Sequence, residues 1–325
     1  MSEDIHLRAI EILKAGARDF ACAGYLRSVS ELERIEIYTK LEYDRLARKY
    51  ASIMEVYRND AGEDWTQLLF ILVMDMVADV PNRPTFTELA RRIPMKHLLR
   101  DRDTNPHYAE AILVGATGLL DDYVYGGYAM AMKRDAKYLL HKYDIKPLVR
   151  ENWSFQRVSA DVIMMKLSQI AELFTMTLDI FDRVIACTTK ADVDSLFGVA
   201  ESQICAKHHS ILRDHESVRP RKIGTEKRNV LGLNVVVLMQ YVYGYYIQSE
   251  EMCSHAQELN ESLLPESNSL IRGWRDRGVV PHNGFESQAL LELSKMHCKT
   301  RNCERCYVGR RASRDLSWLD GRSRQ

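Results

Sequence analysis

Three cysteines lie close together in the segment HCKTRNCERCYVG, residues 297 to 309. Cys298, Cys303 and Cys306 have the spacing C-x4-C-x2-C, whereas the other four cysteines of the chain are scattered. Structural zinc sites are usually tetrahedral and closed by four thiolate or imidazole ligands. The segment therefore provides three of the four ligands that such a site requires.

The sequence leaves the fourth ligand open. The residues that could complete the site are His297, Cys253, His255, Cys205 and His208. In an alternative arrangement, the C-x2-H pair at positions 205 and 208 joins Cys303 and Cys306, and Cys298 is left unused. Both arrangements give a site with four ligands, and the spacing does not choose between them.

Two other interpretations compete with zinc. The spacing C-x4-C-x2-C also begins the ligand series of plant-type iron–sulfur proteins. That series needs another cysteine downstream, and residues 307 to 325 contain none, so zinc is favoured over an iron–sulfur cluster. In the simplest interpretation the thiols hold no metal and pack as small, semi-buried residues.

Positive charge surrounds the cysteines. Residues 299 to 314 contain six basic side chains and one acidic side chain, Glu304. Such a patch can bind phosphate groups through charge and counterion release. The residues that we expect to contact nucleic acid are Lys299, Arg301, Arg305, Arg310 and Arg311. The whole chain has 45 basic and 45 acidic residues, so any such attraction is local, and the competing interpretation is a solvated basic tail.

A second candidate site involves histidines in the middle of the chain. His208, His209 and His215 are close in sequence, and His208 with nearby carboxylates could hold a metal that activates water for hydrolysis. Surface or packing roles are the competing interpretation. The sequence contains no P-loop, no G-x-S-x-G elbow, no H-E-x-x-H and no dinucleotide-binding glycine fingerprint. The common motifs of nucleotide binding and hydrolysis are therefore missing.

Apolar residues recur with the period of a helix through most of the chain. The longest stripe predicts about five helical turns and consists of Leu167, Ile170, Ala171, Phe174, Leu178, Phe181 and Ile185. Ser30 with Glu33, and Thr85 with Glu88, have the spacing of capping boxes at helix starts. Residues 234 to 246 are rich in β-branched and aromatic side chains, but their length favours a buried helix. We therefore expect an all-α fold with a large multi-helix body.

Short segments rich in Pro, Gly and Asn separate the helical stretches. They lie at residues 79–86, 121–128, 145–153, 218–227 and 279–284. None is long enough for a flexible linker, so we expect a single α-helical domain over residues 1–310, with a lobe boundary near residue 150. Residues 311–325 form a polar tail that we expect to be mobile.

The location of the protein follows from its N-terminus and its thiols. The chain begins with acidic residues, without the basic start and apolar run of a secretion signal. Its most apolar stretch, residues 68–80, is interrupted by Asp75 and Asp79 and is shorter than the roughly 20 residues that span a bilayer. Seven cysteines without a secretory signal predict reduced thiols. We therefore expect a cytoplasmic protein with no membrane partner.

Several sequence blocks resemble those of one protein family. They are LARRIPMKHLLRDRD, EAILVGATGLLDD, YLLHKYDIKPLVRENWSFQR, LNVVVLMQYVYG, LPESNSLIRGW, ESQALLELSKMHC and CERCYVG. In this order, over residues 60 to 310, they resemble the C-terminal helical part of domain-of-unknown-function family 2851, a family of bacterial proteins. The resemblance implies that His208, His297 and the three clustered cysteines correspond to positions in the family's blocks.

The resemblance also implies what this chain lacks. Members of the family carry, ahead of the helical part, a region similar to a restriction-type nuclease core with Gly-Pro-Asp and Glu-x-His signatures. This sequence contains neither signature. On this resemblance we expect a chain without the catalytic portion.

These observations favour a non-catalytic helical module that supports nucleic-acid transactions or assembles with a protein partner, with a zinc site among its C-terminal cysteines. The sequence leans against an enzyme without deciding the matter. Two alternatives stay open. One is a metal-dependent hydrolase or nuclease with a site between helices, and the other is a structural scaffold without a ligand.

Overall fold

The computed structural model describes residues 2–15, 20–100, 105, 107–122, 127–177, 179–202, 205–206, 220–315 and 318. These residues form helices joined by turns, and the strand-like pairing among them is limited to an isolated bridge between Ala200 and Lys222. The prediction of an all-α fold is confirmed. The chain divides into two compact units, of which unit 1 comprises Met1–Ala51 and Gln248–Gln325, and unit 2 comprises Ser52–Ile247.

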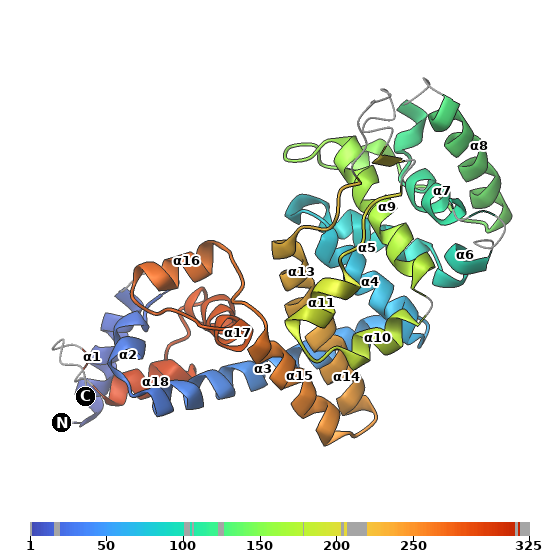
Figure 1. The fold of residues 1–325 in the computed structure, drawn as a ribbon. Helices are drawn as coiled ribbons and strands as arrows, with labels where there is room; N and C mark the ends of the chain where they lie inside the picture. Colours follow the sequence, from blue (N-terminus) through green and yellow to red (C-terminus); the bar gives the residue numbers. More distant parts are fainter. Residues whose placement is uncertain are drawn as a thin grey trace. The chain divides into compact units, whose positions relative to one another are not determined.

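Unit 1 is built from helices of both ends of the chain (Figure 1). The N-terminal end provides α1 (Ser2–Ala15), α2 (Ala23–Ser28) and the first part of α3 (Glu31–Asn59). The C-terminal end provides α15 (Glu250–Ser262), α16 (Ser269–Asp276), α17 (Gly284–Glu292), the π-helical turn η5 (Leu293–Cys298) and α18 (Tyr307–Arg314). Helix α1 packs against α18, and α17 packs against α15 and α16. The two ends of the chain therefore share one core.

The core of unit 1 contains aliphatic and aromatic side chains from both of these ends. Ile37 and Leu41 of α3 are fully buried together with Leu293 of η5. Trp274 of α16 is also fully buried, and its Nε1 donates a hydrogen bond of 2.8 Å to Ser294 Oγ. An indole N–H needs such an acceptor when it is removed from water. This bond fixes α16 against η5, the turn that leads to the clustered cysteines.

Hydrogen bonds and an ion pair connect α3 to the C-terminal helices. Arg45 donates to Glu42 Oε1 over 2.8 Å, and both side chains are almost inaccessible to water. Asn260 of α15 donates to the same oxygen over 2.9 Å. Arg48 forms a two-point pair with Glu292 of α17, with Nε donating over 3.0 Å. A buried charge needs partners of this kind because its desolvation is costly.

Unit 2 is formed by the middle of the chain, from the last turns of α3 to α14 (Figure 1). Its first helices are α4 (Trp65–Val77), η1 (Val80–Asn82), α5 (Arg83–Arg92), α6 (Met95–Arg100), α7 (Tyr108–Gly115), η2 (Leu119–Asp122) and α8 (Gly127–Lys142). The following helices are η3 (Arg150–Asn152), α9 (Ala160–Met176), α10 (Ile180–Ala186), α11 (Lys190–Leu196), α13 (Thr225–Leu231), the π-helical turn η4 (Gly232–Val236) and α14 (Val237–Tyr246). Helix α7 packs against α8 and α9, and α4 packs against α5.

The apolar helix α4 lies in the core of unit 2. Asp64 accepts hydrogen bonds from the first amides of this helix and so fixes its start. Phe70 of α4 meets Phe174 of α9 edge to face, with ring centroids 5.3 Å apart. Gln67, three residues before Phe70, is also buried. Its side-chain amide donates to Ala90 O over 3.1 Å and accepts from Met95 N over 2.7 Å. A single buried amide thereby fixes the connection between α5 and α6.

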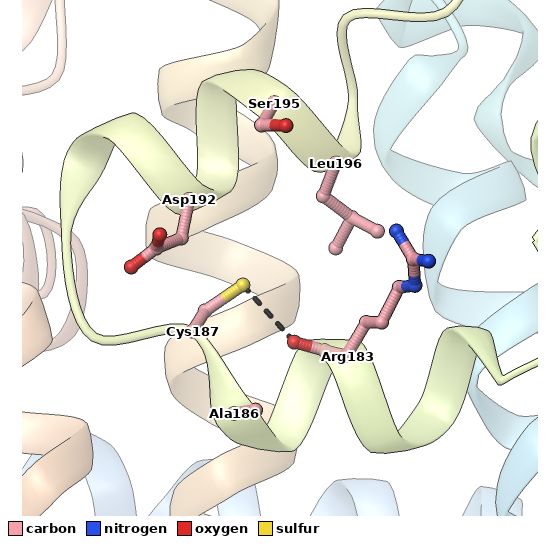
Figure 2. A pocket seen from close by; sticks show the side chains of 6 residues that line it. All are labelled: Arg183, Ala186, Cys187, Asp192, Ser195 and Leu196. Carbon is pink, nitrogen blue, oxygen red and sulfur yellow. Dashed lines mark hydrogen bonds between the residues drawn. The ribbon is translucent and has the colours of Figure 1, made fainter.

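A surface pocket of about 220 Å³ lies where α10 leads into α11 (Figure 2). It is lined by Arg183, Ala186, Cys187, Asp192, Ser195 and Leu196. The Cys187 thiol donates to Arg183 O over 3.2 Å. Hydrogen bonds from the side chain of Thr189, and from Thr188, lower the pKa of Asp192 to about 2. The polar groups of this pocket therefore serve the two helix ends.

Some of the local helix predictions are confirmed. Residues 234 to 246 are helical, as the end of η4 and all of α14. Ser30 Oγ accepts from Glu33 N over 3.3 Å, and the Glu33 carboxylate accepts from Ser30 N over 3.3 Å, so this capping box forms. These two predictions depend only on neighbouring residues, which explains their success.

Two other helix predictions are wrong. Thr85 does not cap a helix, because α5 begins at Arg83 with Pro84 in its first turn, where a missing N–H costs nothing. The Thr85 hydroxyl instead donates to Asn152 O over 2.7 Å. The stripe predicted as one helix between residues 167 and 185 is broken, since α9 ends at Met176 and α10 begins at Ile180. The β-branched Thr177 after α9 has a non-helical backbone, with φ of −117° and ψ of 88°.

The unit boundaries lie within α3, between residues 51 and 52, and after α14, between residues 247 and 248. The lobe boundary that we expected near residue 150 therefore lies inside unit 2. The predicted polar tail from residue 311 overlaps α18, in which Ala312 and Ser313 are buried. Among the helices that the structure describes, none has both the length and the apolar character needed to cross a membrane.

Candidate metal centre and a buried carboxylate cluster

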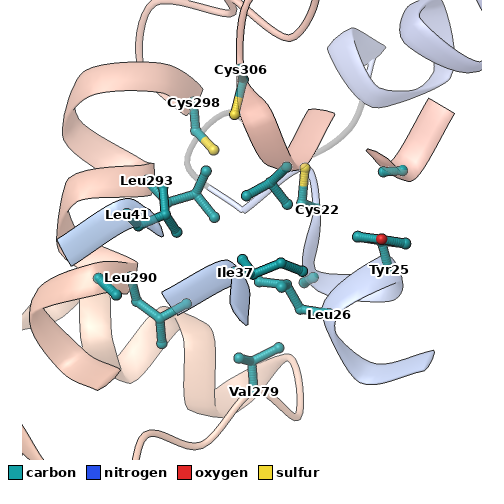
Figure 3. Packing of buried hydrophobic residues seen from close by; sticks show 14 of the residues in the cluster. Cys22, Tyr25, Leu26, Ile37, Leu41, Val279, Leu290, Leu293, Cys298 and Cys306 are labelled. Carbon is teal, nitrogen blue, oxygen red and sulfur yellow. The ribbon is translucent and has the colours of Figure 1, made fainter. Parts of the chain in front are cut away.

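Four cysteines occupy one buried region of unit 1. Cys298, Cys303 and Cys306 are 5%, 6% and 2% exposed, and Cys22 is 2% exposed. All four belong to the same hydrophobic cluster. Figure 3 shows the sulfur atoms of Cys22, Cys298 and Cys306 directed toward one region of this core. Cys22 was missed as a candidate ligand because it lies at the opposite end of the chain, where no spacing relates it to the others.

Each of these cysteines stands at the end of a helix or in a turn. Cys298 is the last residue of the π-helical turn η5. Such turns are rare in proteins, and many of those that occur lie at functional sites. Arg301, in the turn that follows, has a φ of 52°, in the left-handed region that side chains seldom adopt. Cys306 immediately precedes α18, and Cys22 immediately precedes α2. The chain changes direction at these points, which allows the thiols to face one core.

Ion pairs and hydrogen bonds hold the cysteine segment against the N-terminal helices. Glu304, between two of the cysteines, pairs with Lys14 of α1. In α18, Tyr307 donates to Glu36 Oε1 of α3 over 2.8 Å, and Arg311 donates to the same oxygen over 2.7 Å. The C-terminal segment is therefore docked on α1 and α3 by its own side chains.

Burial raises the pKa of Cys22, Cys303 and Cys306. At Cys22 the neighbouring Cys298, Cys306 and Cys303 raise the pKa further. At Cys303 the nearby Lys14 opposes the effect of burial, and at Cys306 the backbone amides of Gly309 and Val308 oppose it. Burial is the main cause of the raised pKa at each of these three thiols.

The other candidate ligands are less well placed. His297 is half-buried, and its backbone carbonyl accepts from Asn302 N over 3.2 Å. Cys253 lies in α15 and is not part of the buried cluster, while Cys205 lies in unit 2. His208 falls outside the described residues. Within the part of the chain that the structure describes, no three Cys, His, Asp or Glu side chains already have metal-binding geometry.

The predicted nucleic-acid contacts divide into two groups. Lys299, Arg301, Arg305 and Arg310 are exposed on the surface around the cysteines. Arg311 is half-buried and pairs with Glu36 and Glu33. Its hydrogen bond to Glu36 raises its pKa, so Arg311 is committed to the contact between α18 and α3. The exposed residues leave a positive surface beside the buried thiols.

Unit 2 contains a separate group of buried ionisable side chains around Glu110 of α7. Tyr128 of α8 donates to Glu110 Oε1 over 3.3 Å. Glu110 Oε2 is buried without a hydrogen-bond partner, and His107 Nδ1 lies 3.9 Å from it. Burial raises the pKa of Glu110, while hydrogen bonds from Ser202 and Ser168 oppose this shift. The carboxyl group therefore favours its protonated form more than an exposed Glu does.

A second carboxylate, Glu201, has the opposite behaviour. Burial raises its pKa, but hydrogen bonds from Arg221 outweigh that effect and lower it. Arg221 donates to Glu201 Oε1 through Nε over 2.8 Å and to Oε2 through Nη2 over 3.0 Å. Cys205 Sγ donates to Glu201 Oε2 over 3.3 Å, and burial together with both carboxylates raises its pKa. Two carboxyl groups with pKa values shifted in opposite directions are typical of acid–base sites.

Comparison with known proteins gives a family match and little else. A family model described as "Protein of unknown function (DUF2851)" matches residues 2–269. This region begins earlier than the 60–310 expected from the sequence blocks, and it ends before the three clustered cysteines. No curated protein and no solved structure matches the chain. The interpretation of the cysteine region therefore depends on its own chemistry.

Proposed function

The chain belongs to the DUF2851 family of proteins of unknown function, and we propose that it is a non-catalytic helical module that binds nucleic-acid phosphates through a basic turn. In this proposal a metal ion, zinc rather than an iron–sulfur cluster, is held by the clustered cysteines and fixes that turn. The module works in a cytoplasm, where thiols stay reduced. The observation that carries the proposal is the placement of exposed cations directly beside buried cysteines.

The geometry of the turn supports phosphate binding. Lys299, Arg301 and Arg305 lie between or next to cysteines that are buried in the core. Their side chains are exposed, and none of them forms an ion pair among the described residues. The charge of Arg305 does help to lower the pKa of Glu304. A rigid backbone that presents free cations loses less entropy on binding than a mobile tail. The neutral net charge of the chain keeps this attraction local.

A partner protein would supply the chemistry. The sequence contains neither of the nuclease signatures that the family resemblance led us to seek. We propose that this module positions nucleic acid or assembles with a catalytic chain. This division of labour accounts for a phosphate-binding surface without a recognised catalytic motif.

A charge-reversal experiment tests the proposal. The double variant Lys299→Glu/Arg301→Glu is compared with Arg58→Glu/Lys137→Glu, which reverses two exposed cations of unit 2. Fluorescence anisotropy with labelled single-stranded and duplex DNA is recorded at rising salt. We expect at least a tenfold weaker affinity for the first variant, and a duplex salt slope that is lower by about 0.9 for each phosphate that the variant no longer neutralises.

Two outcomes would overturn the proposal. One is the absence of DNA binding by the unmodified chain at low salt, and the other is equal binding by the two double variants. A chain that binds neither DNA nor metal is a structural scaffold.

One observation favours the alternative of a metal-dependent hydrolase or nuclease. The buried Glu110 and Glu201 and the half-buried Cys205 have shifted pKa values, and His208 follows Cys205 by three positions. Carboxylates and imidazole are ligands for hydrolytic metal ions. This alternative predicts hydrolysis of DNA or a phosphate ester that requires a divalent metal and is lost in His208→Ala, with the helical content unchanged.

A further inference from the structure

The cysteine spacing leaves a four-ligand site one ligand short, and the structure supplies a candidate that no spacing indicates. We propose that Cys22 is the fourth ligand, and that Cys22, Cys298, Cys303 and Cys306 bind one Zn²⁺ through four thiolates. This inference rests on the metal site in the proposed function, but it does not depend on the contact with nucleic acid.

The four cysteines come from three separate parts of unit 1. Cys22 lies before α2, Cys298 ends η5, and the other two flank the turn that leads into α18. All four are at most 6% exposed and share one cluster. Figure 3 shows Cys22 Sγ approaching from the N-terminal helices toward the sulfur atoms of Cys298 and Cys306. Four thiolates are one of the ligand sets that close a structural zinc site.

Cys303 and Cys306 stand on a tight turn of the kind that brings two thiols to one metal. Cys306 N donates to Asn302 O over 3.0 Å, and Arg305 N donates to the same oxygen over 3.3 Å. The turn therefore folds back on itself between the two cysteines. Gly309 allows the start of α18 to lie directly against the Cys303 backbone. C-x2-C pairs on such turns commonly provide two zinc ligands.

In the proposed site the thiols must change conformation to reach one metal ion. In a tetrahedral site with Zn–S bonds of about 2.3 Å, neighbouring sulfur atoms are about 3.8 Å apart. Rotation about the Cα–Cβ bonds moves each sulfur without moving the backbone. No ligand geometry exists yet among the described side chains, so zinc would close the site by selecting thiol rotamers that converge.

His297 is a weaker candidate than Cys22. It directly precedes Cys298 in η5, and adjacent residues of a helix point in different directions. Cys298 is turned into the core, whereas His297 remains half-buried. Cys22 is fully inside the same core. We therefore prefer Cys22, which is distant in sequence but lies in the same core, to His297 as the fourth ligand.

Charge balance also suits four thiolates. Four cysteines lose four protons on binding, and the resulting Zn²⁺ complex carries two negative charges. Arg301 lies two residues before Cys303, and Lys14 pairs with Glu304, the residue after Cys303. Arg310 N donates to Cys306 O over 3.0 Å. These cations would offset the negative centre. Part of the basic patch thus has a role at the metal as well as toward phosphates.

The test measures zinc binding by the full chain in a thiol-free reductant. Zinc is titrated in competition with a chromophoric chelator for the unmodified protein, Cys22→Ser and the control Cys253→Ser, a half-buried thiol of α15. We expect one zinc per chain for the unmodified protein and the control, and at least a tenfold weaker affinity for Cys22→Ser. Circular dichroism of each metal-free protein shows whether the substitution disturbs the fold.

A second variant keeps the test decisive if Cys22→Ser does not fold. Cys22→His retains a ligand but changes its chemistry, so Co²⁺ bound to it should show weaker sulfur-to-metal charge transfer than Co²⁺ bound to the unmodified chain. An unaltered cobalt spectrum would overturn the assignment of Cys22. Failure of the unmodified chain to bind zinc would overturn the site, and purification with iron and acid-labile sulfide would overturn the choice of zinc. None of these measurements involves DNA, so the phosphate-binding proposal stands or falls separately.

Discussion

The α-carbon of Gly309 lies directly against the backbone carbonyl of Cys303. A Cβ at position 309 would be 2.4 Å from Cys303 O and 3.0 Å from its carbonyl carbon. Carbon and oxygen do not approach so closely without a shift of the backbone, and the obstacle here is main chain rather than a flexible side chain. Gly309 is therefore required where α18 begins, at the turn that carries two of the cysteines.

Gly309→Ala should destabilise unit 1. Forcing a methyl group into a packed site typically costs about 1–3 kcal/mol, and the displaced turn should also weaken the proposed binding of zinc through Cys303. Denaturant unfolding followed by circular dichroism measures the first effect. Gly127→Ala, where a Cβ meets nothing within 4 Å, is the control and should leave stability unchanged or slightly higher. Equal stability of the two variants would contradict the required contact.

Glu42 should make unit 1 less stable as the pH rises. Burial raises its pKa to about 7, although Arg45 and Asn260 oppose the shift. A carboxyl whose pKa is higher in the folded state stabilises the protein fully below its unfolded pKa, near 4.5, and this contribution is lost as the pH rises through about 7. The loss between these values amounts to up to about 3 kcal/mol.

Glu42→Gln should remove this pH dependence, because the amide cannot ionise and still accepts a hydrogen bond. The free energy of unfolding of the unmodified protein minus that of Glu42→Gln should fall between pH 5 and pH 8. Glu258→Gln replaces an exposed carboxyl on α15 and serves as the control. A constant difference for Glu42→Gln over this pH range would show that Glu42 titrates as an exposed Glu does.

The helices could be predicted because their signals are local. The apolar period indicated the fold class, and Ser30 with Glu33 marked a helix start from residues three apart. The prediction at Thr85 failed because Pro84 moved the start of α5. The single helix predicted up to Ile185 failed because a continuous apolar stripe also results when two helices follow one another around the same core.

The candidate site could be predicted only in part, for a related reason. Three cysteines carry a spacing pattern, but the position of Cys22 beside them depends on how α2 packs against η5 and α18. The pairing of Glu110 with Tyr128, and of Glu201 with Arg221, likewise depends on tertiary contacts. Sequence patterns show ligands within one segment, whereas ligands from separate segments appear only when the chain is folded.

Gln240 should be important for the stability of unit 2. This fully buried amide of α14 donates to Val184 O over 3.0 Å and to Cys187 O over 2.8 Å, and so satisfies carbonyls at the end of α10. In Gln240→Leu these buried acceptors lose a donor, at a cost of about 1–3 kcal/mol. Unfolding of Gln240→Leu is compared with that of Gln257→Leu, an exposed position in α15. An equally small effect at both positions would contradict the role assigned to the buried amide.

Glu110 provides a pH test of the buried cluster in unit 2. Burial raises its pKa, so its contribution to stability is present at acidic pH and is lost as the pH rises above the ordinary Glu pKa of about 4.3. Relative to Glu110→Gln, the unmodified protein should therefore lose stability from pH 4 upward. Glu226→Gln, which replaces an exposed carboxyl of α13, should show no such trend.

The same variant separates a structural from a catalytic role for this cluster. If the cluster performs metal-dependent hydrolysis, Glu110→Gln should abolish that activity at a pH where both proteins are fully folded. Tyr128→Phe removes the hydroxyl that donates to Glu110 Oε1 but leaves the carboxyl, so it should shift the pH profile of any activity without abolishing it. Activity unchanged in Glu110→Gln would restrict Glu110 to a role in stability, because an amide cannot replace a carboxyl in proton transfer.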